Sequence, residues 1–193
     1  MRQLSGRMME PGMKAQAELE TQASVSTDLG ALPEWNLDDL YPGMSSPAFA
    51  ADLARAEEQC RAFAGKWKGA LAGIAAGENA SASLAQAIRE FEALEDLLGR
   101  IMSYAGLIYT GNTGDPARAK FYGDAQEKIT NASSDLVFFS LELNRIDDAQ
   151  LNAAMASGPL AHYRPWLEDI RREKPYQLDD KLEQLFHGKA SSG

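Results

Sequence analysis

The segment LAQAIREFEALEDLLGRIMSYAGLI, residues 84–108, decides the fold because its apolar residues recur every three or four positions. An α-helix completes a turn in 3.6 residues, so this spacing places them along one helix face. That face consists of Leu84, Ile88, Phe91, Leu94, Leu98, Ile101 or Met102, Ala105 and Ile108. Ser81 or Ser83 is the predicted N-cap, and the turn residues Gly111-Asn112-Thr113-Gly114 predict the end of the helix.

Two further long helices are predicted, one on each side of this segment. Ser45-Ser46-Pro47 and Asp115-Pro116 each place a capping side chain before a proline, which is a common helix start. The first apolar face consists of Phe49, Leu53, Ala56, Cys60, Phe63 and Trp67, and the second of Phe121, Ala125, Ile129, Ala132, Leu136, Phe139 and Leu143. The short connection before Pro116 predicts an antiparallel hairpin. The glycines at 65, 69, 73 and 77 predict a flexible connector after the first helix.

Shorter helices are predicted toward the C-terminus. Asp147 or Asp148 caps a segment that Gly158-Pro159 ends, and another runs from Leu160 to Ile170 with Pro165 in its first turn or at a kink. The last spans Leu178–Phe186 and has acidic residues in its first turn, which suits the helix dipole. Because no strand pattern appears, the predicted class is all-α, an antiparallel helical bundle.

Residues 1–30 are polar and lack a sustained period, so we expect a disordered or loosely attached leader, followed by a helical domain over residues 31–193. At the start of the domain, Trp35, Leu37, Leu40 and Tyr41 form a short apolar strip that Pro42-Gly43 closes. A strip of this length forms no core alone. We therefore expect it to lie across the later helices.

Composition narrows the possible partners. The 193 residues include 19 basic and 28 acidic side chains, a net charge of −9, which argues against nucleic acid as a partner. No apolar run approaches the ~20 residues that a membrane span needs, and no secretory signal is visible. A single cysteine, Cys60, excludes an internal disulfide and favours a reducing compartment, so the predicted location is the cytoplasm.

No residue pattern predicts a site within this chain, so the sequence predicts no catalytic, cofactor-binding or metal-binding residues. His162 and His187 stand alone, without a second ligand one helical turn away. We expect His162 to be packed or on the surface, and His187 to contact free carbonyls at a helix end. Cys60 falls on an apolar helix face, which predicts a buried, inert thiol.

Charged residues also have structural interpretations. Glu92, Glu95 and Asp96 are expected on the solvent side of their helix, and Glu142, between apolar neighbours, is expected to form a buried ion pair with an arginine. The cluster Arg171-Arg172-x-Lys174 at a predicted helix C-terminus is explained by the helix dipole.

Several short motifs, taken in order, resemble one protein family. They are Leu32-Pro33-x-Trp35-Asn36-Leu37-x-Asp39-Leu40-Tyr41, Gly99-Arg100-x-x-Ser103-Tyr104-Ala105, Phe138-Phe139-x-Leu141-Glu142-Leu143, Trp166-Leu167-Glu168-x-x-Arg171, Lys174-Pro175-Tyr176-x-Leu178 and Glu183-x-Leu185. Together they resemble the N-terminal domain of oligoendopeptidase F, a zinc metallopeptidase of the thimet-oligopeptidase kind. The resemblance extends from about Leu32 to the C-terminus, but Gly188 stands where the family has an acidic residue.

The resemblance implies a helical lobe of a two-lobed peptidase that encloses short oligopeptides. In the family, a His-Glu-x-x-His helix and a downstream Glu hold zinc in the catalytic domain, and this sequence contains no such motif. We therefore expect the chain alone to be inactive, to need a missing C-terminal catalytic domain with its zinc, and to meet oligopeptide substrate only in the full enzyme. A truncation, a split gene product and a decayed copy are the alternatives for its origin.

A free-standing helical protein–protein interaction domain is the alternative function. Under the peptidase interpretation, faces that evolved to meet the catalytic domain would be exposed and favour self-association. These are the last helix, with Leu182, Leu185 and Phe186, and the strip from Leu32 to Tyr41.

Overall fold

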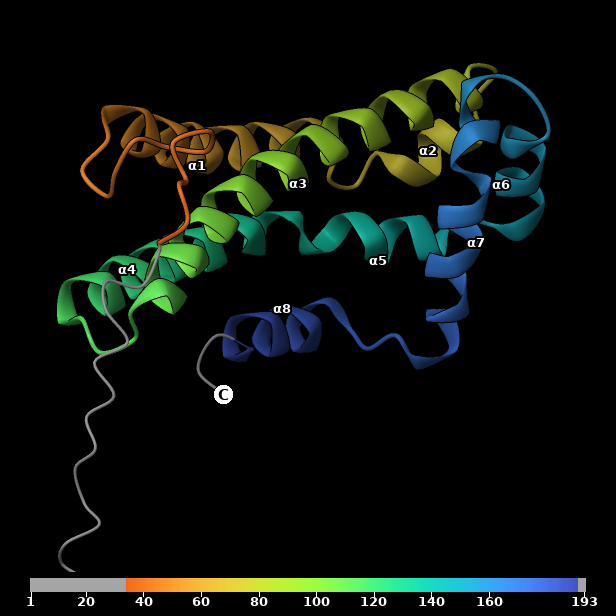
Figure 1. The fold of residues 1–193 in the computed structure, drawn as a ribbon. Coiled ribbons are helices and arrows are strands. Elements are labelled where there is room, and N and C mark those ends of the chain that lie inside the picture. The colour runs from red at the N-terminus through yellow and green to blue at the C-terminus, as the bar shows by residue number, and fades with distance from the viewer. Residues whose placement is uncertain (1–33, 191–193) are drawn as a thin grey trace, which may run out of the picture. The chain divides into compact units, whose positions relative to one another are not determined.

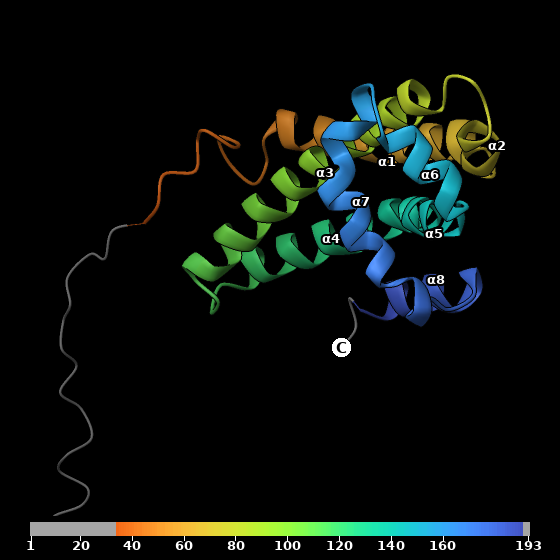
Figure 2. The same cartoon turned by 90° about the vertical axis from the view of Figure 1, so that its right-hand side faces the viewer.

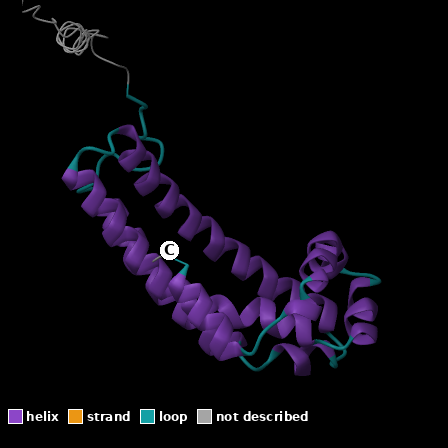
Figure 3. Cartoon of the chain, turned by 90° about the horizontal axis from the view of Figure 1, so that it is seen from below, coloured by secondary structure: helices purple, strands orange, loops and turns teal. Residues whose placement is uncertain are grey.

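The computed structural model describes residues 34–190, and the predicted leader, residues 1–30, lies outside that range. The described residues form an all-α domain, as predicted, and none of them forms a strand (Figure 3). The α-helices are α1 Pro47–Trp67, α2 Leu71–Ala75, α3 Ala80–Gly111, α4 Pro116–Ser133, α5 Val137–Arg145, α6 Asp148–Met155, α7 Arg164–Arg172 and α8 Asp180–Lys189. Three 3₁₀ turns, η1 Ser134–Leu136, η2 Pro159–Tyr163 and η3 Lys174–Tyr176, connect some of them.

The three long helices pack on one another and form most of the core. α3 and α4 form the predicted antiparallel hairpin, and α1 contacts both (Figure 1). All six predicted residues on the apolar face of α1 are buried, as are Leu84, Ile88, Leu94, Leu98, Ile101 and Ala105 on α3. Each buried Leu or Ile side chain contributes about 1.5–3 kcal/mol to the free energy of unfolding, so the apolar faces of α1 and α3 are a main source of stability.

The strip before α1 lies across these helices, as expected. Tyr41 is 1% exposed, and its ring packs edge-on against Phe49 of α1 and Tyr104 of α3, with centroids 5.1 Å away in each case. Leu37 and Leu40 are partly buried beside it. Trp35, in contrast, is 80% exposed, so it adds no surface to this core.

The proline-marked starts of α1 and α4 are confirmed. The Ser46 hydroxyl accepts a hydrogen bond from the Ala48 N–H at 3.2 Å, and the Asp115 carboxylate accepts one from the Ala117 N–H at 2.8 Å. Each bond satisfies one of the N–H groups that a helix start leaves without an internal partner.

The predicted cap of α3 was wrong, because the helix begins at Ala80 and its N-cap is Asn79. Ser81 makes a tertiary contact instead: its hydroxyl donates to the Ser157 carbonyl at 2.8 Å and accepts from the Leu160 N–H at 3.2 Å. Gly158, at φ 78°, allows this approach, since a Cβ there would lie 2.8 Å from the Ser81 oxygen.

The helix predicted to run from Pro116 to Leu143 is two helices, α4 and α5, separated by η1. The hydroxyls of Ser133 and Ser134 donate to the carbonyls of Thr130 and Asn131, which are groups of the preceding turn. Such side-chain bonds compete with regular helical hydrogen bonding and favour a local change of helix type. The apolar face continues through the break, which explains why its periodicity did not reveal the change.

The connector after α1 is partly ordered as a helix, so the prediction of a flexible connector was wrong. α2 spans Leu71–Ala75, and both of these residues are buried. Gly69 has a φ of 80°, and its N–H donates to the Glu142 carboxylate of α5 at 2.7 Å. The burial of Leu71 thus holds a glycine-rich segment against the bundle.

The C-terminal helices add a further layer beside α5. Residues 164–189 run from α7 to α8, and α8 lies against α5 on the side away from α1 and α3 (Figures 1 and 2). Asp147 caps α6 through the N–H groups of Ala149 and Gln150, and Asp179 caps α8 in the same way through Lys181 and Leu182. Among residues 34–190, no helix is long and apolar enough to cross a membrane.

Candidate functional site

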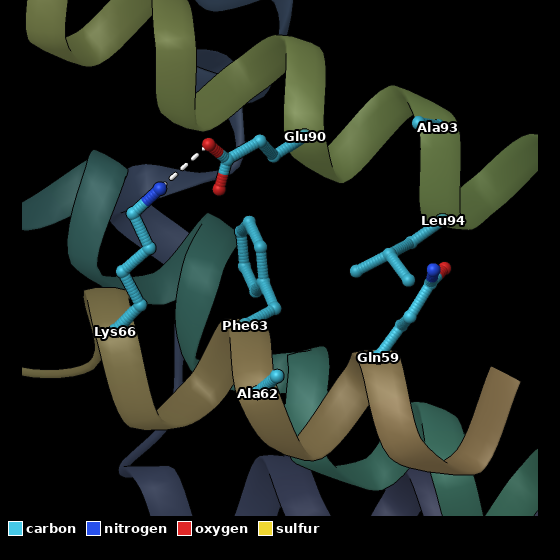
Figure 4. Close-up of a pocket in the computed structure, with 7 residues that line it drawn as sticks. All are labelled: Gln59, Ala62, Phe63, Lys66, Glu90, Ala93 and Leu94. Carbon is cyan, nitrogen blue, oxygen red and sulfur yellow. Dashed lines mark hydrogen bonds and ion pairs between the residues drawn. The ribbon is translucent and has the colours of Figure 1, made fainter. Parts of the chain in front are cut away.

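A groove between α1 and α3 has a mainly apolar lining. It encloses about 290 Å³. Figure 4 shows Gln59, Ala62, Phe63 and Lys66 of α1 on one side and Glu90, Ala93 and Leu94 of α3 on the other. The sequence did not indicate it, because it depends on how two helices pack.

An ion pair closes one end of the groove. The Lys66 ammonium lies 2.6 Å from the Glu90 carboxylate (Figure 4). That carboxylate also accepts hydrogen bonds from the Trp67 indole N–H at 2.8 Å and the Gln86 amide at 3.0 Å. Burial acts to raise the pKa of Glu90, but these hydrogen bonds outweigh it and hold the pKa below its usual value. Glu90 is therefore ionised at neutral pH, and its lowered pKa makes it a weak general base.

The groove can hold a small apolar group but contains no chemistry for bond cleavage. Its lining has no hydroxyl, thiol or imidazole, and its two charged groups already satisfy one another. A nucleophile with an adjacent base, or three metal ligands, would be needed for hydrolysis.

The two histidines lie on separate elements. His162 is exposed, as the sequence allowed, with its ring edge-on to Tyr163 at 5.1 Å between centroids. His187 differs from the expectation: its Nε2 lies 2.9 Å from the Ser133 hydroxyl of α4, so it joins α8 to α4 through a side-chain contact. This contact depends on how α8 packs against α4, which the spacing of residues in the sequence does not predict.

Glu92, Glu95 and Asp96 of α3 are exposed, as predicted. The Glu92 carboxylate accepts a hydrogen bond from the Tyr163 hydroxyl at 2.8 Å. Partial desolvation raises the pKa of Glu95, and His187 acts in the opposite direction. Glu142 is half-buried and bonds to the Gly69 backbone, so the prediction that it forms a buried ion pair was wrong.

Cys60 is fully buried, as predicted, and burial raises the pKa of its thiol to about 11, with the carboxylates of Asp135 and Glu95 adding to the effect. A thiol that stays protonated at neutral pH is a poor nucleophile. Cys60 therefore belongs to the core.

Arg171 makes structural contacts between helices that the sequence did not reveal. Its guanidinium donates to the carbonyls of Leu143 at 2.9 Å and Ile146 at 2.8 Å, just where α5 ends, and it also pairs with Asp148. We predicted a role at the C-terminus of its own helix, and its main contacts are with the end of another. The local sequence around Arg171 does not predict that it donates hydrogen bonds to the carbonyls at the end of α5.

Metal binding finds no support among the residues that the structure describes. In residues 34–190 there is no group of three His, Cys, Asp or Glu side chains that could hold a metal ion.

The segment 142–193 matches the family model described as Oligopeptidase F, which represents the N-terminal domain of M3 peptidases. This match confirms the predicted relationship to the N-terminal domain of oligoendopeptidase F, over the residues it spans. It includes the motifs from Trp166 to Leu185, whereas those at Leu32–Tyr41 and Gly99–Ala105 lie outside it. The comparisons with curated proteins and with solved structures gave no match.

Proposed function

We propose that this chain is the substrate-enclosing N-terminal part of a zinc metalloendopeptidase that hydrolyses short oligopeptides. The observation that supports this function best is the family match at residues 142–193. The all-α architecture of residues 34–190 agrees with a helical lobe.

In this proposal catalysis is the task of a separate catalytic domain. Zinc would be held there by a His-Glu-x-x-His helix and a further glutamate, and would activate the attacking water. The present chain would contribute helical walls that restrict access to short, unfolded peptides, and would have no peptidase activity by itself.

The surface of the C-terminal segment supports a partner domain. Around α8, five large apolar side chains are exposed: Tyr176, Leu178, Leu182, Leu185 and Phe186. Such a concentration commonly marks an interface. We propose that this surface meets the catalytic domain. The same exposure also favours the alternative function, a free-standing interaction domain, so the two proposals must be separated by experiment.

The sharpest test is the coding DNA that follows codon 193, together with the activity it encodes. We expect a His-Glu-x-x-His motif there, and cleavage of a quenched-fluorescent oligopeptide only when that product is added to this chain with zinc. The chain alone, with or without zinc, should release no fluorescence. Absence of the motif would favour the interaction domain, and activity of the chain alone would contradict both proposals.

We also propose a cytoplasmic location, supported by the single reduced cysteine at a buried position. Fractionation of the cells that produce the protein tests it, with a periplasmic or extracellular protein as the outcome against it.

A further inference from the structure

A second recess, enclosed by α5, α7, η3 and α8, contains two buried polar atoms without a partner. It encloses about 300 Å³ and is lined by Ser140, Leu141, Asn144, Ile170, Glu173, Tyr176, Gln177 and Glu183. The Oδ1 atom of Asn144 and the Nε2 atom of Gln177 are both buried and make no hydrogen bond. We refer to this recess as the amide pocket.

An unsatisfied amide in a folded core is costly. Asn144 is 4% exposed, one of only two buried polar residues in the part of the chain that the structure describes. Leaving a buried acceptor without a donor costs about 1–3 kcal/mol. A leucine at this position would avoid that cost, since its neighbours Leu141, Leu143 and Ile146 are apolar and buried. A ligand that donates a hydrogen bond to Asn144 Oδ1 would remove this cost.

The charges of the amide pocket define the ligand further. Its lining includes two carboxylates, Glu173 and Glu183, and no lysine, arginine or histidine. Neighbouring cations are engaged elsewhere, because Lys174 lies 3.2 Å from Asp148 and Arg145 lies 2.5 Å from Asp180. Glu183 uses one oxygen for the Leu178 N–H at 2.9 Å, and a carboxylate has further lone pairs to offer.

A ligand that matches all these groups has a positive donor beside a neutral acceptor. We propose that the amide pocket binds the free N-terminus of a peptide. The α-ammonium would donate to Asn144 Oδ1 and to the carboxylates, and the carbonyl of the first residue would accept from Gln177 Nε2. A recess of about 300 Å³ suits one or two small residues and lies at the lower end of ligand-site volumes.

This inference does not depend on the peptidase assignment, because binding is measured on this chain without catalysis. The ¹⁵N-labelled chain is titrated with alanyl-alanine amide, and the side-chain amide signals of Asn144 and Gln177 are followed by NMR. We expect saturable shifts of both signals. N-acetyl-alanyl-alanine amide, which lacks the positive charge, should bind at least ten-fold more weakly. Nα-acetyl-lysine amide, whose ammonium has no adjacent carbonyl, should also bind at least ten-fold more weakly.

Variants test whether the pocket residues are responsible. Asn144→Leu should weaken binding at least ten-fold and raise the melting temperature, while the matched change Asn152→Leu, on the exposed face of α6, should leave binding unchanged. Gln177→Met, in the loop before α8, should also weaken binding and provides the test if Asn144→Leu fails to fold. Absence of saturable shifts, equal binding of the acetylated or lysine probe, or unchanged binding by both pocket variants would overturn the proposal.

Discussion

Tyr41 shows how one hydroxyl secures the segment that precedes the bundle. It donates to the Asp52 carboxylate at 2.9 Å, and the Arg100 guanidinium lies 4.9 Å from the centre of its ring. A hydrogen bond to a charged group contributes about 1.5–3 kcal/mol, so Tyr41→Phe should lower the free energy of unfolding by about 2 kcal/mol at pH 8. Chemical denaturation measures this difference.

The same contact predicts an alkaline dependence. Burial, with the hydrogen bond to Asp52, raises the pKa of Tyr41 to about 12, above the ordinary value of 10. The folded state thus favours the protonated phenol of Tyr41. The contribution of this hydroxyl to the free energy of unfolding is complete below pH 10 and is lost as the pH rises toward 12. The stability difference between the native chain and Tyr41→Phe should shrink over that interval. Tyr109→Phe, whose ring stacks on Tyr122, is the control. A constant difference would contradict this account of Tyr41.

Cys60 offers a direct measure of core closure, because it is the only cysteine in the chain. With a pKa of about 11, against ~8.5 for a free thiol, its thiolate fraction at pH 8 falls by roughly 200-fold, and burial blocks the reagent as well. Labelling with a chromogenic disulfide at pH 8 should therefore be at least ~100-fold slower in the native chain than in guanidinium. Comparable rates would show that the α1–α3 core opens readily.

At the scale of elements, Arg171 links the end of α5 to α7. Because its guanidinium serves two backbone carbonyls from a largely buried position, 14% exposed, Arg171→Met should cost about 2–3 kcal/mol of unfolding free energy. Arg172→Met is the matched control: this side chain is 79% exposed and pairs only with Asp169 one turn earlier, so the expected cost is within ~0.5 kcal/mol. If Arg171→Met and Arg172→Met lower stability equally in thermal unfolding, the contact of Arg171 with α5 contributes nothing to stability.

Local patterns predicted the helices well and their junctions less well. The face of α1 was predicted residue by residue, because 3.6-residue periodicity and a Ser-Pro start are local properties. The break between α4 and α5 was missed because the apolar spacing continues through η1. The partners of Ser81, Arg171 and His187 were missed because each lies on an element distant in sequence, where only packing decides which groups meet.

The two recesses illustrate the same limit for candidate sites. Asn144 sits among apolar residues of a predicted helix face, so the sequence alone marks it only as an irregularity. Asn144 becomes a candidate binding residue only because η3 and α8 pack beside it and do not donate a hydrogen bond to its Oδ1 atom. The family motifs from Trp166 to Leu185, in contrast, were visible in the sequence, since they depend on residue identity and order.

At the scale of the whole molecule, the bundle buries one set of apolar faces and leaves another in water. The core formed by α1, α3 and α4 is continuous, whereas α8 has no buried residue among Asp180–Lys189 and exposes Leu182, Leu185 and Phe186. A helix that contributes so little to its own core is held mainly by polar contacts, such as Arg145–Asp180 and Ser133–His187. Its apolar side chains are therefore available to a partner.

We accordingly expect the isolated chain to self-associate in a concentration-dependent manner through the α8 surface. Leu185 is 51% exposed and Phe186 58% exposed, so Leu185→Asp should place a charge in the contact without disturbing the bundle. Sedimentation velocity should show a loss of oligomers in this variant, and circular dichroism should show an unchanged melting temperature. Gln184→Asp, which adds a charge on the same helix but removes no apolar surface, is the matched control and should associate like the native chain. A native chain that stays monomeric at high concentration would contradict the interface and favour a free-standing protein whose α8 meets a different partner.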